Sequence, residues 1–235
     1  MKPNKHLKQP ASKVSGLAFY FYYPLLFIIL LWAVFLLGHV FHLHMIHWGI
    51  YPRKFSGLKG ILSGLFVHAG FKHIFNNTLT LFVLMTFLFY HYRRVAWQIL
   101  SLGIFFTGFL TWTIGRPSYH VGASGLVYLL LSFLFFSGLF SHYYRLIAVS
   151  LIIVFLYGGL VWYLFPLVPT ISWEGHLSGF VTGLLLAILY RRKIQTFVPK
   201  NTVKMYPEDD LFLKYFDEEG NFIEKTEENS QKNES

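Results

Sequence analysis

Long apolar segments separated by short polar connections are the feature that most constrains the fold of this chain. The segment 17–38, for example, reads LAFYFYYPLLFIILLWAVFLLG and carries no charged residue. About 20 apolar residues are enough to cross a bilayer as a helix. Only 13% of the 235 residues are charged, whereas soluble domains usually carry about 25%. We therefore expect an all-α, polytopic membrane protein.

Six segments fit membrane-spanning helices. They cover about 17–38, 71–90, 97–114, 124–140, 146–165 and 173–190. The first begins too late and is too long to be a plain signal peptide. The expected organisation is a basic cytoplasmic N-terminus at 1–16, a six-helix membrane domain at 17–193 and an acidic cytoplasmic tail at 194–235. Low hydrophobicity and high charge predict that part of the tail is disordered.

The distribution of lysine and arginine predicts the orientation of these spans, because both are enriched in cytoplasmic connections. Ten precede the first span or follow the second, fourth and sixth: Lys2, Lys5, Lys8, Lys13, Arg93, Arg94, Arg145, Arg191, Arg192 and Lys193. Five lie on the opposite side: Arg53, Lys54, Lys59, Lys72 and Arg116. Both termini are therefore expected in the cytoplasm. The compact six-span form makes the bacterial inner membrane the expected location. The second, fourth and sixth spans then begin at the outer surface.

The acidic residues and cysteines exclude several classes of function. Ten of the eleven acidic residues lie between Glu208 and Glu234, and the other is Glu174. A transporter or channel would place ionisable residues along a path through its spans, which this distribution disfavours. The chain has no cysteine, so disulfides, thiolate metal sites and cysteine nucleophiles are excluded. The net charge of +9 comes from short clusters between apolar runs, so we expect the lipid bilayer, and not nucleic acid, as a partner.

Two short motifs place polar residues at the start of a span. Ser124 lies in GASG at the start of the fourth span, and His176 lies in EGHLSGFVTG at the start of the sixth. Each has a structural interpretation, as a helix-packing serine and as an interfacial histidine. Each also has a catalytic one, as a nucleophile and as its base. Gly179 and Gly183 form a small-xxx-small face that would bring the sixth helix close to a neighbour.

A third motif, HAGFKHIFNN, opens the second span. His73 and Asn77 are four residues apart and share a helix face, with Asn76 as the alternative partner and His68 in the approach to the helix.

Four further histidines lie in the connection after the first span: His39, His42, His44 and His47. No carboxylate or thiolate lies near them, so we expect an interfacial connection and no metal site or cofactor.

The polar residues of the three spans share one depth, just below the outer surface, and independent packing residues have no reason to do so. We therefore predict an active site in which His176 activates Ser124. Glu174 is only two residues from His176 and points elsewhere, so a dyad is expected, with His176 held by packing. Tyr128 lies one turn after Ser124 and could stack on the imidazole.

Stabilisation of an oxyanion requires hydrogen-bond donors. Three are available in this part of the chain: the side chains of His73 and Asn77, and the backbone N–H of Ser124.

In order, spacing and topology, the three motifs resemble the rhomboid family of intramembrane serine proteases over about residues 55–190, in its minimal six-helix form. The resemblance implies a Ser124–His176 dyad, oxyanion roles for His73 and Asn77, and packing of Tyr128 on the histidine. It also implies cleavage of transmembrane segments of other proteins near the outer surface. The alternative is an inactive rhomboid-like protein that binds membrane clients. The oligomeric state is left open.

The small neighbours Gly122 and Gly125 leave room beside Ser124 for a histidine-bearing helix and a peptide carbonyl.

In one respect the chain departs from the family pattern. Many rhomboids carry an adjacent Trp-Arg pair in the first loop, whereas here Trp48 and Arg53 are five residues apart.

Overall fold

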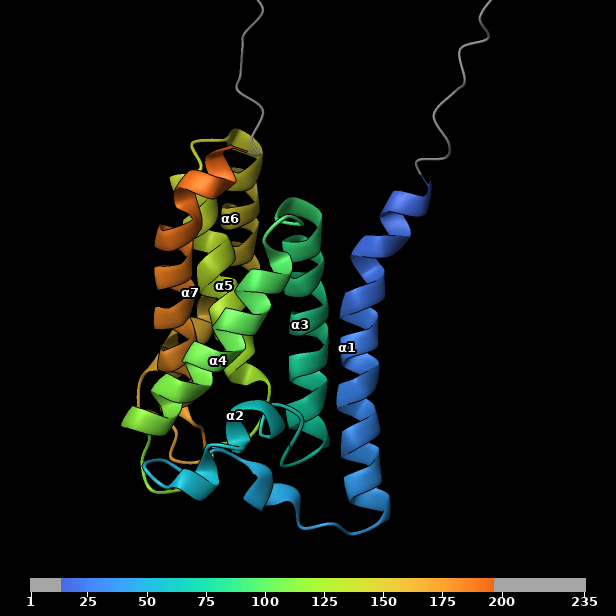
Figure 1. Ribbon diagram of the computed structural model, residues 1–235, viewed down its shortest axis with the longest axis vertical. Helices are drawn as coiled ribbons and strands as arrows, with labels where there is room; N and C mark the ends of the chain where they lie inside the picture. Colours follow the sequence, from blue (N-terminus) through green and yellow to red (C-terminus); the bar gives the residue numbers. More distant parts are fainter. Residues whose placement is uncertain (1–13, 197–235) are drawn as a thin grey trace, which may run out of the picture. The chain divides into compact units, whose positions relative to one another are not determined.

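The computed structural model describes the backbone of residues 14–196 and the side chains of residues 20–196. Most of the expected basic N-terminus (1–16) and nearly all of the expected acidic tail (194–235) lie outside the described residues. Six long helices make up most of the described part (Figure 1): α1 Val14–Val40, α3 Phe71–His91, α4 Ala96–Ile114, α5 Ser124–Phe140, α6 Tyr144–Tyr157 and α7 Trp173–Gln195. The connections contain the short helix α2 (Gly60–Ser63) and the 3₁₀ helices η1 (Met45–Trp48), η2 (Phe55–Gly57) and η3 (Gly158–Leu164).

All six expected spans are helical, which confirms the all-α fold. In the part of the chain that the structure describes, four stretches are long and apolar enough to cross a membrane: Tyr20–Val40, Phe71–His91, Ala96–Ile114 and Tyr144–Leu164. α5 is apolar but shorter, and α7 is less apolar because glycine, serine, threonine and histidine occupy its buried face. The fifth span is continuous α-helix only to Tyr157 and continues as η3. Gly158 and Gly159 lie at the change, where their low helix propensity weakens the α-helical form.

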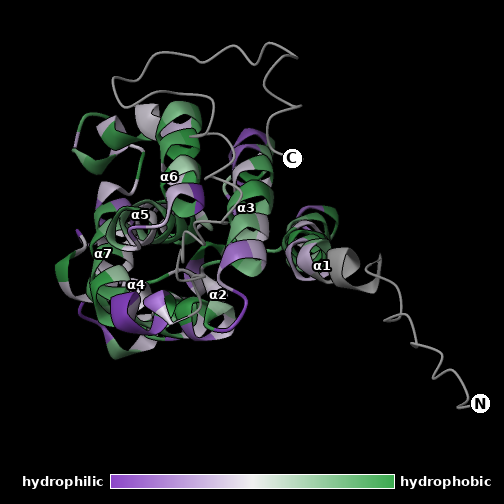
Figure 2. Cartoon of the chain, turned by 90° about the horizontal axis from the view of Figure 1, so that it is seen from above, coloured by the Kyte–Doolittle hydropathy of each residue, from purple (hydrophilic) through white to green (hydrophobic). Residues whose placement is uncertain are grey.

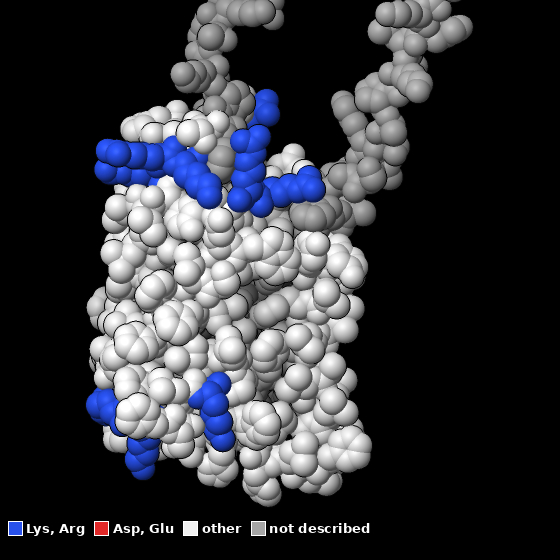
Figure 3. Space-filling model, in the orientation of Figure 1, with Lys and Arg blue, Asp and Glu red and all other residues white. Residues whose placement is uncertain are grey.

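The outward surface of the helices is apolar, as expected for a lipid solvent. Large exposed side chains include Ile29 on α1, Phe105 on α4 and Phe155 on α6, the last of which is 88% exposed. On the face shown in Figure 3, lysine and arginine gather near the two ends, and the surface between them carries neither. A charge-free apolar belt bounded by basic residues fits a hydrocarbon layer with aqueous surfaces on both sides. The chain is therefore an integral membrane protein.

α5 is the central helix and packs most closely against α7 (Figure 2). The closeness depends on glycine. A Cβ added at Gly179 would collide with the carbonyl oxygen of Gly125, and one added at Gly183 with that of Leu129. α1 lies at the edge beside α3, where Trp32 Nε1 donates a hydrogen bond of 2.9 Å to Thr78. The small-xxx-small face expected in the sixth span is therefore the face that meets α5.

The connection between α1 and α3 lies across one end of the bundle and is anchored to α4 (Figure 1). The Arg53 guanidinium donates to the carbonyl oxygens of Thr113 at 3.1 Å and Gly115 at 2.8 Å, at the C-terminal end of α4. A cation is favourable there because the last carbonyls of a helix lack intrahelical partners. Trp48 is 54% exposed. Arg53 therefore anchors this loop without a tryptophan next to it in the sequence, and Trp112 of α4 donates a hydrogen bond of 2.9 Å to the Lys54 carbonyl.

Candidate active site

Ser124 is the first residue of α5, and the backbone before it is tightly constrained. Gly122 has a φ of 106°, which side-chain-bearing residues rarely adopt. Its N–H donates to the Gly64 carbonyl at 2.8 Å. The turn therefore presents the serine hydroxyl at the N-terminus of α5, where unsatisfied backbone N–H groups favour negative charge.

His176 lies in the first turn of α7 and is 7% exposed. Its Nε2 is 2.9 Å from Ser124 Oγ, within hydrogen-bond distance. The Gly179–Gly125 contact lies about one helical turn further along α7. The structure therefore brings together two residues that are 52 positions apart in the sequence.

The second nitrogen of the His176 ring also has a partner, which sequence reasoning missed. Nδ1 is 3.0 Å from the carbonyl oxygen of Tyr163 in η3. A carbonyl can only accept, so Nδ1 carries the proton and Nε2 is free to accept the Ser124 hydroxyl proton. A backbone carbonyl thus stands where serine proteases with a triad place a carboxylate. The expectation that packing alone holds His176 was incomplete.

Tyr128 makes two contacts at the same place. Its ring stacks on the His176 imidazole, with centroids 4.3 Å apart and planes inclined by 18°. Its hydroxyl donates to the Leu160 carbonyl in η3 at 2.7 Å. Tyr128 and His176 are therefore both tied to η3, and their hydrogen bonds fix that segment against the ends of α5 and α7.

His73 and Asn77 lie near the start of α3, and their surroundings differ. The His73 ring lies against Gly122, because an added Cβ at Gly122 would stand 2.6 Å from His73 Cε1. Asn77 is 6% exposed, and its Nδ2 has no hydrogen-bond partner among the residues described. Asn76 is exposed. A buried amide donor without a partner is costly, and of the two asparagines Asn77 carries such a donor whereas Asn76 is exposed.

His68 supports the turn before Ser124. Its Nε2 accepts the N–H of Ala123 at 3.4 Å, and its Nδ1 lies 3.3 Å from the Phe66 carbonyl. Burial, assisted by the neighbouring His73, lowers the pKa of His68 to about 4. The imidazole is therefore neutral at neutral pH, which is the state that this pair of bonds requires.

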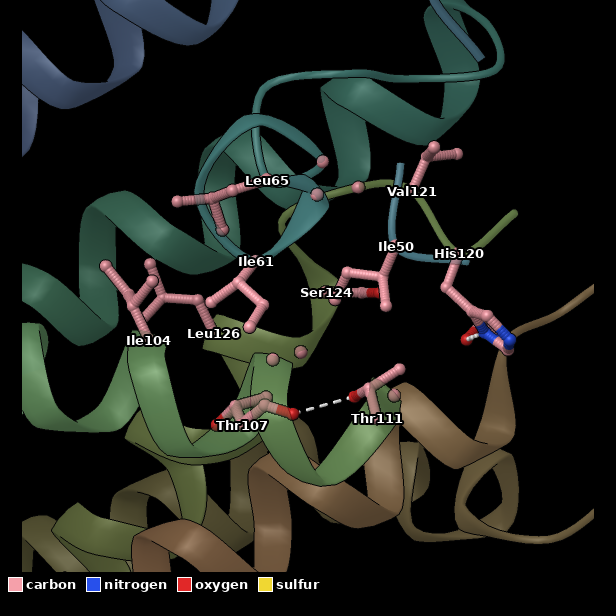
Figure 4. Close-up of a pocket in the computed structure, with 17 residues that line it drawn as sticks. Ile50, Ile61, Leu65, Ile104, Thr107, Thr111, His120, Val121, Ser124 and Leu126 are labelled. Carbon is pink, nitrogen blue, oxygen red and sulfur yellow. Dashed lines mark hydrogen bonds between the residues drawn. The ribbon is translucent and has the colours of Figure 1, made fainter. Parts of the chain in front are cut away.

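A cavity of about 60 Å³ lies beside Ser124 (Figure 4). It is lined mainly by Ile50, Ile61 and Leu126, by glycines including Gly122 and Gly125, and by polar side chains that include Thr107, His120 and Ser172. A small cavity with an apolar wall and a few polar groups can admit a water molecule or a small side chain next to the hydroxyl.

The histidines at 39, 42, 44 and 47 lie apart from this site and are exposed. His39 stacks on Phe35, and His47 lies edge-on to Tyr119. Within residues 14–196, no group of three or more histidine, aspartate or glutamate side chains is arranged to hold a metal ion.

Comparisons with known proteins agree with this architecture. A family model described as "Rhomboid domain" matches residues 56–193. Uncharacterized proteins of Mycobacterium tuberculosis and Mycobacterium bovis are each 37% identical over 153 residues, which is 60% of this chain and 62% of theirs. An uncharacterized protein of Mycobacterium leprae is 32% identical over 175 residues, covering 70% of this chain and 69% of its own. The chain thus spans about 62% of the length of the first of these relatives.

Proposed function

The chain belongs to the rhomboid family, and from that premise we propose that it is an intramembrane serine endopeptidase that uses a Ser124–His176 dyad. The observation that carries the proposal is the 2.9 Å contact between Ser124 Oγ and His176 Nε2 beside a cavity. A serine becomes a nucleophile at neutral pH only when a base can take its proton.

The first half of the reaction forms an acyl-enzyme. Ser124 Oγ attacks the scissile carbonyl carbon while His176 Nε2 takes the hydroxyl proton. The tetrahedral intermediate then collapses, the C–N bond breaks, and the imidazolium gives this proton to the leaving amine. The Tyr163 carbonyl accepts a hydrogen bond from Nδ1–H throughout and keeps the ring in the required tautomer.

The second half returns the free enzyme. Water attacks the acyl carbon and His176 takes one of its protons. The ester bond to Ser124 Oγ breaks, the carboxylic acid leaves, and the proton returns to Oγ.

The oxyanion formed in each half needs donors that are already in place. The proposed donors are the backbone N–H of Ser124, the unpartnered amide of Asn77 and the imidazole of His73. Removal of one such donor typically costs about 2.7–4 kcal/mol in the transition state.

The proposed substrates are transmembrane segments of other proteins, cut near the outer surface. In this proposal both termini are cytoplasmic and the membrane is the bacterial cell membrane. Residues 17–193 form the protease domain between a basic N-terminus and an acidic tail.

The test compares wild type with Ser124→Ala and His176→Ala on a model transmembrane substrate in detergent. Cleavage by the wild type and none by the two variants is expected. A fluorophosphonate probe should label wild type and fail on Ser124→Ala. Equal cleavage by wild type and Ser124→Ala would remove the nucleophile assignment.

The alternative is an inactive rhomboid-like protein that binds membrane clients. The contact between Ser124 and His176 disfavours this alternative, because a client-binding protein does not need a base within hydrogen-bond distance of a serine. It would be supported if the wild type bound a transmembrane segment stably and neither cleaved it nor reacted with the probe.

A further inference from the structure

The two loops that lead into α5 and α7 are joined by their side chains. His120 lies four residues before Ser124, and Ser172 lies four residues before His176. The Ser172 hydroxyl is hydrogen-bonded to His120 Nδ1, while His120 Nε2 lies 3.1 Å from the Arg116 carbonyl. One side-chain contact therefore links the approaches to both residues of the dyad.

Arg116 makes a second link between the same loops. Its Nη2 donates to the Ile171 carbonyl at 2.6 Å, and its backbone N–H donates to Glu174 Oε1 at 3.3 Å. Its Nε lies 3.6 Å from the same carboxylate oxygen. Four side chains thus connect the loop before α5 with the start of α7: Arg116, His120, Ser172 and Glu174. We call this set the polar clamp.

Ser172 departs from its usual local role. It occupies the N-cap of α7, where a serine hydroxyl normally accepts a backbone N–H from the first turn. Its side chain makes no such bond within the described residues and instead donates to His120. Ser172 therefore lacks the usual capping bond and contacts His120 instead, which indicates that this contact between the loops is important for the structure.

Glu174 also links the two loops, through its charge. It is the one acidic residue in the described part of the chain, and it is 2% exposed. A buried carboxylate is costly unless it is paired. Burial lowers the pKa of His120, so its ring is neutral at neutral pH and Nδ1 can accept a hydrogen bond from the Ser172 hydroxyl. Protonated His120 would lose that acceptor.

His176 lies between two fixed points on α7. On one side, Gly179 rests against Gly125; on the other, Ser172 and Glu174 are held by the polar clamp. We propose that the polar clamp is a positioning device that sets the separation of Ser124 and His176. The proposal rests on the proposed function, because it concerns the rate of that same reaction.

The test measures kcat and KM on a model transmembrane substrate for four variants. Ser172→Ala and His120→Leu break the contact between His120 and Ser172, and Glu174→Gln removes the charge that faces Arg116. Each is expected to lower kcat about 10- to 100-fold, as misplacement of reacting groups does, with KM unchanged. His120→Asn is expected to restore most of kcat, because its amide can occupy the position of Nδ1.

Ser150→Ala is the matched control. Like that of half-buried Ser172, the hydroxyl of Ser150 links two segments, since it donates to the Phe135 carbonyl at 2.9 Å; Ser150 itself is buried. It should lower the melting temperature about as much as Ser172→Ala does and leave kcat unchanged. If kcat falls equally in both, or stays at the wild-type value in Ser172→Ala, the positioning role is overturned. An inactive wild type would instead overturn the proposed function.

Discussion

The contact between α5 and α7 gives a quantitative prediction for Gly179→Ala. An added Cβ would stand 3.1 Å from the Gly125 carbonyl carbon and 3.1 Å from the Leu129 nitrogen, and nearer still to the Gly125 carbonyl oxygen. These neighbours are backbone atoms, which cannot turn aside as the end of a side chain can. The helices must therefore move apart.

The size of the movement follows from ordinary contact distances. Heavy atoms that are not bonded prefer about 3.5–4.0 Å, so the two contacts at 3.1 Å alone require the helices to separate by about 0.4–0.9 Å, and the closer contact with the Gly125 carbonyl oxygen requires more. His176 lies about one turn from Gly179 and would move with it. The distance of 2.9 Å from Ser124 Oγ to His176 Nε2 would rise to at least about 3.3–3.8 Å, at or beyond the limit of a hydrogen bond. We expect kcat to fall about 10- to 100-fold.

The assay is the initial rate of cleavage of a transmembrane substrate, together with the rate of fluorophosphonate labelling. Gly38→Ala on α1 is the matched control, because a methyl group there meets only the flexible side chain of Met45 and lies away from the dyad. Its kcat should equal that of the wild type. A folded Gly179→Ala variant with wild-type kcat and labelling rate would refute the idea that glycine packing sets the dyad distance.

Three further predictions test the surrounding residues. Asn77→Ala should lower kcat about 10²- to 10³-fold with little change in KM, and an equal loss in Asn76→Ala would contradict the assignment. Tyr128→Phe keeps the stacked ring and loses only the bond to Leu160, so it should retain more activity than Tyr128→Ala in the same cleavage assay. The pKa of His68 is about 4 in the folded protein and about 6.5 when unfolded, so the unfolded chain binds the proton more readily. The stability that depends on a neutral His68 imidazole is therefore complete above about pH 6.5 and is lost as the pH falls towards 4. His68→Gln should therefore show a smaller fall in melting temperature between pH 7 and pH 4, whereas an unchanged fall would mean that another group is responsible.

Much of the architecture could be predicted from the sequence because hydrophobic length is a strong constraint in a membrane. The expected spans at 71–90, 97–114 and 124–140 differ from the helices by at most one residue at either end. Gly179 and Gly183 were expected to form a packing face, and in the structure they do. The sequence also predicted that Ser124 and His176 lie at the same depth in the membrane, because each motif lies at the start of a span. Whether these residues catalyse a reaction stays a prediction.

The features that the sequence did not predict depend on backbone groups and on loops. The carbonyl acceptors of Tyr163 and Leu160 have no signature, because every residue carries a carbonyl. η3 arises where Gly158 and Gly159 interrupt a run that otherwise looks like one helix. The contact between His120 and Ser172 joins two loops 52 residues apart, and no periodic pattern relates them. Only the assembled fold identifies such partners.

The Tyr163 carbonyl has a consequence for the way this protein can be studied. Every amino acid supplies the same backbone oxygen, so replacement of the Tyr163 side chain leaves the acceptor in place. A survey by alanine substitution would pass over position 163 even if the bond to His176 were essential. The hydrogen bond between the Tyr163 carbonyl and His176 can be weakened only by changes that redirect the main chain or alter the peptide linkage itself. Tolerance to mutation is therefore a poor measure of the contribution of this segment to the dyad.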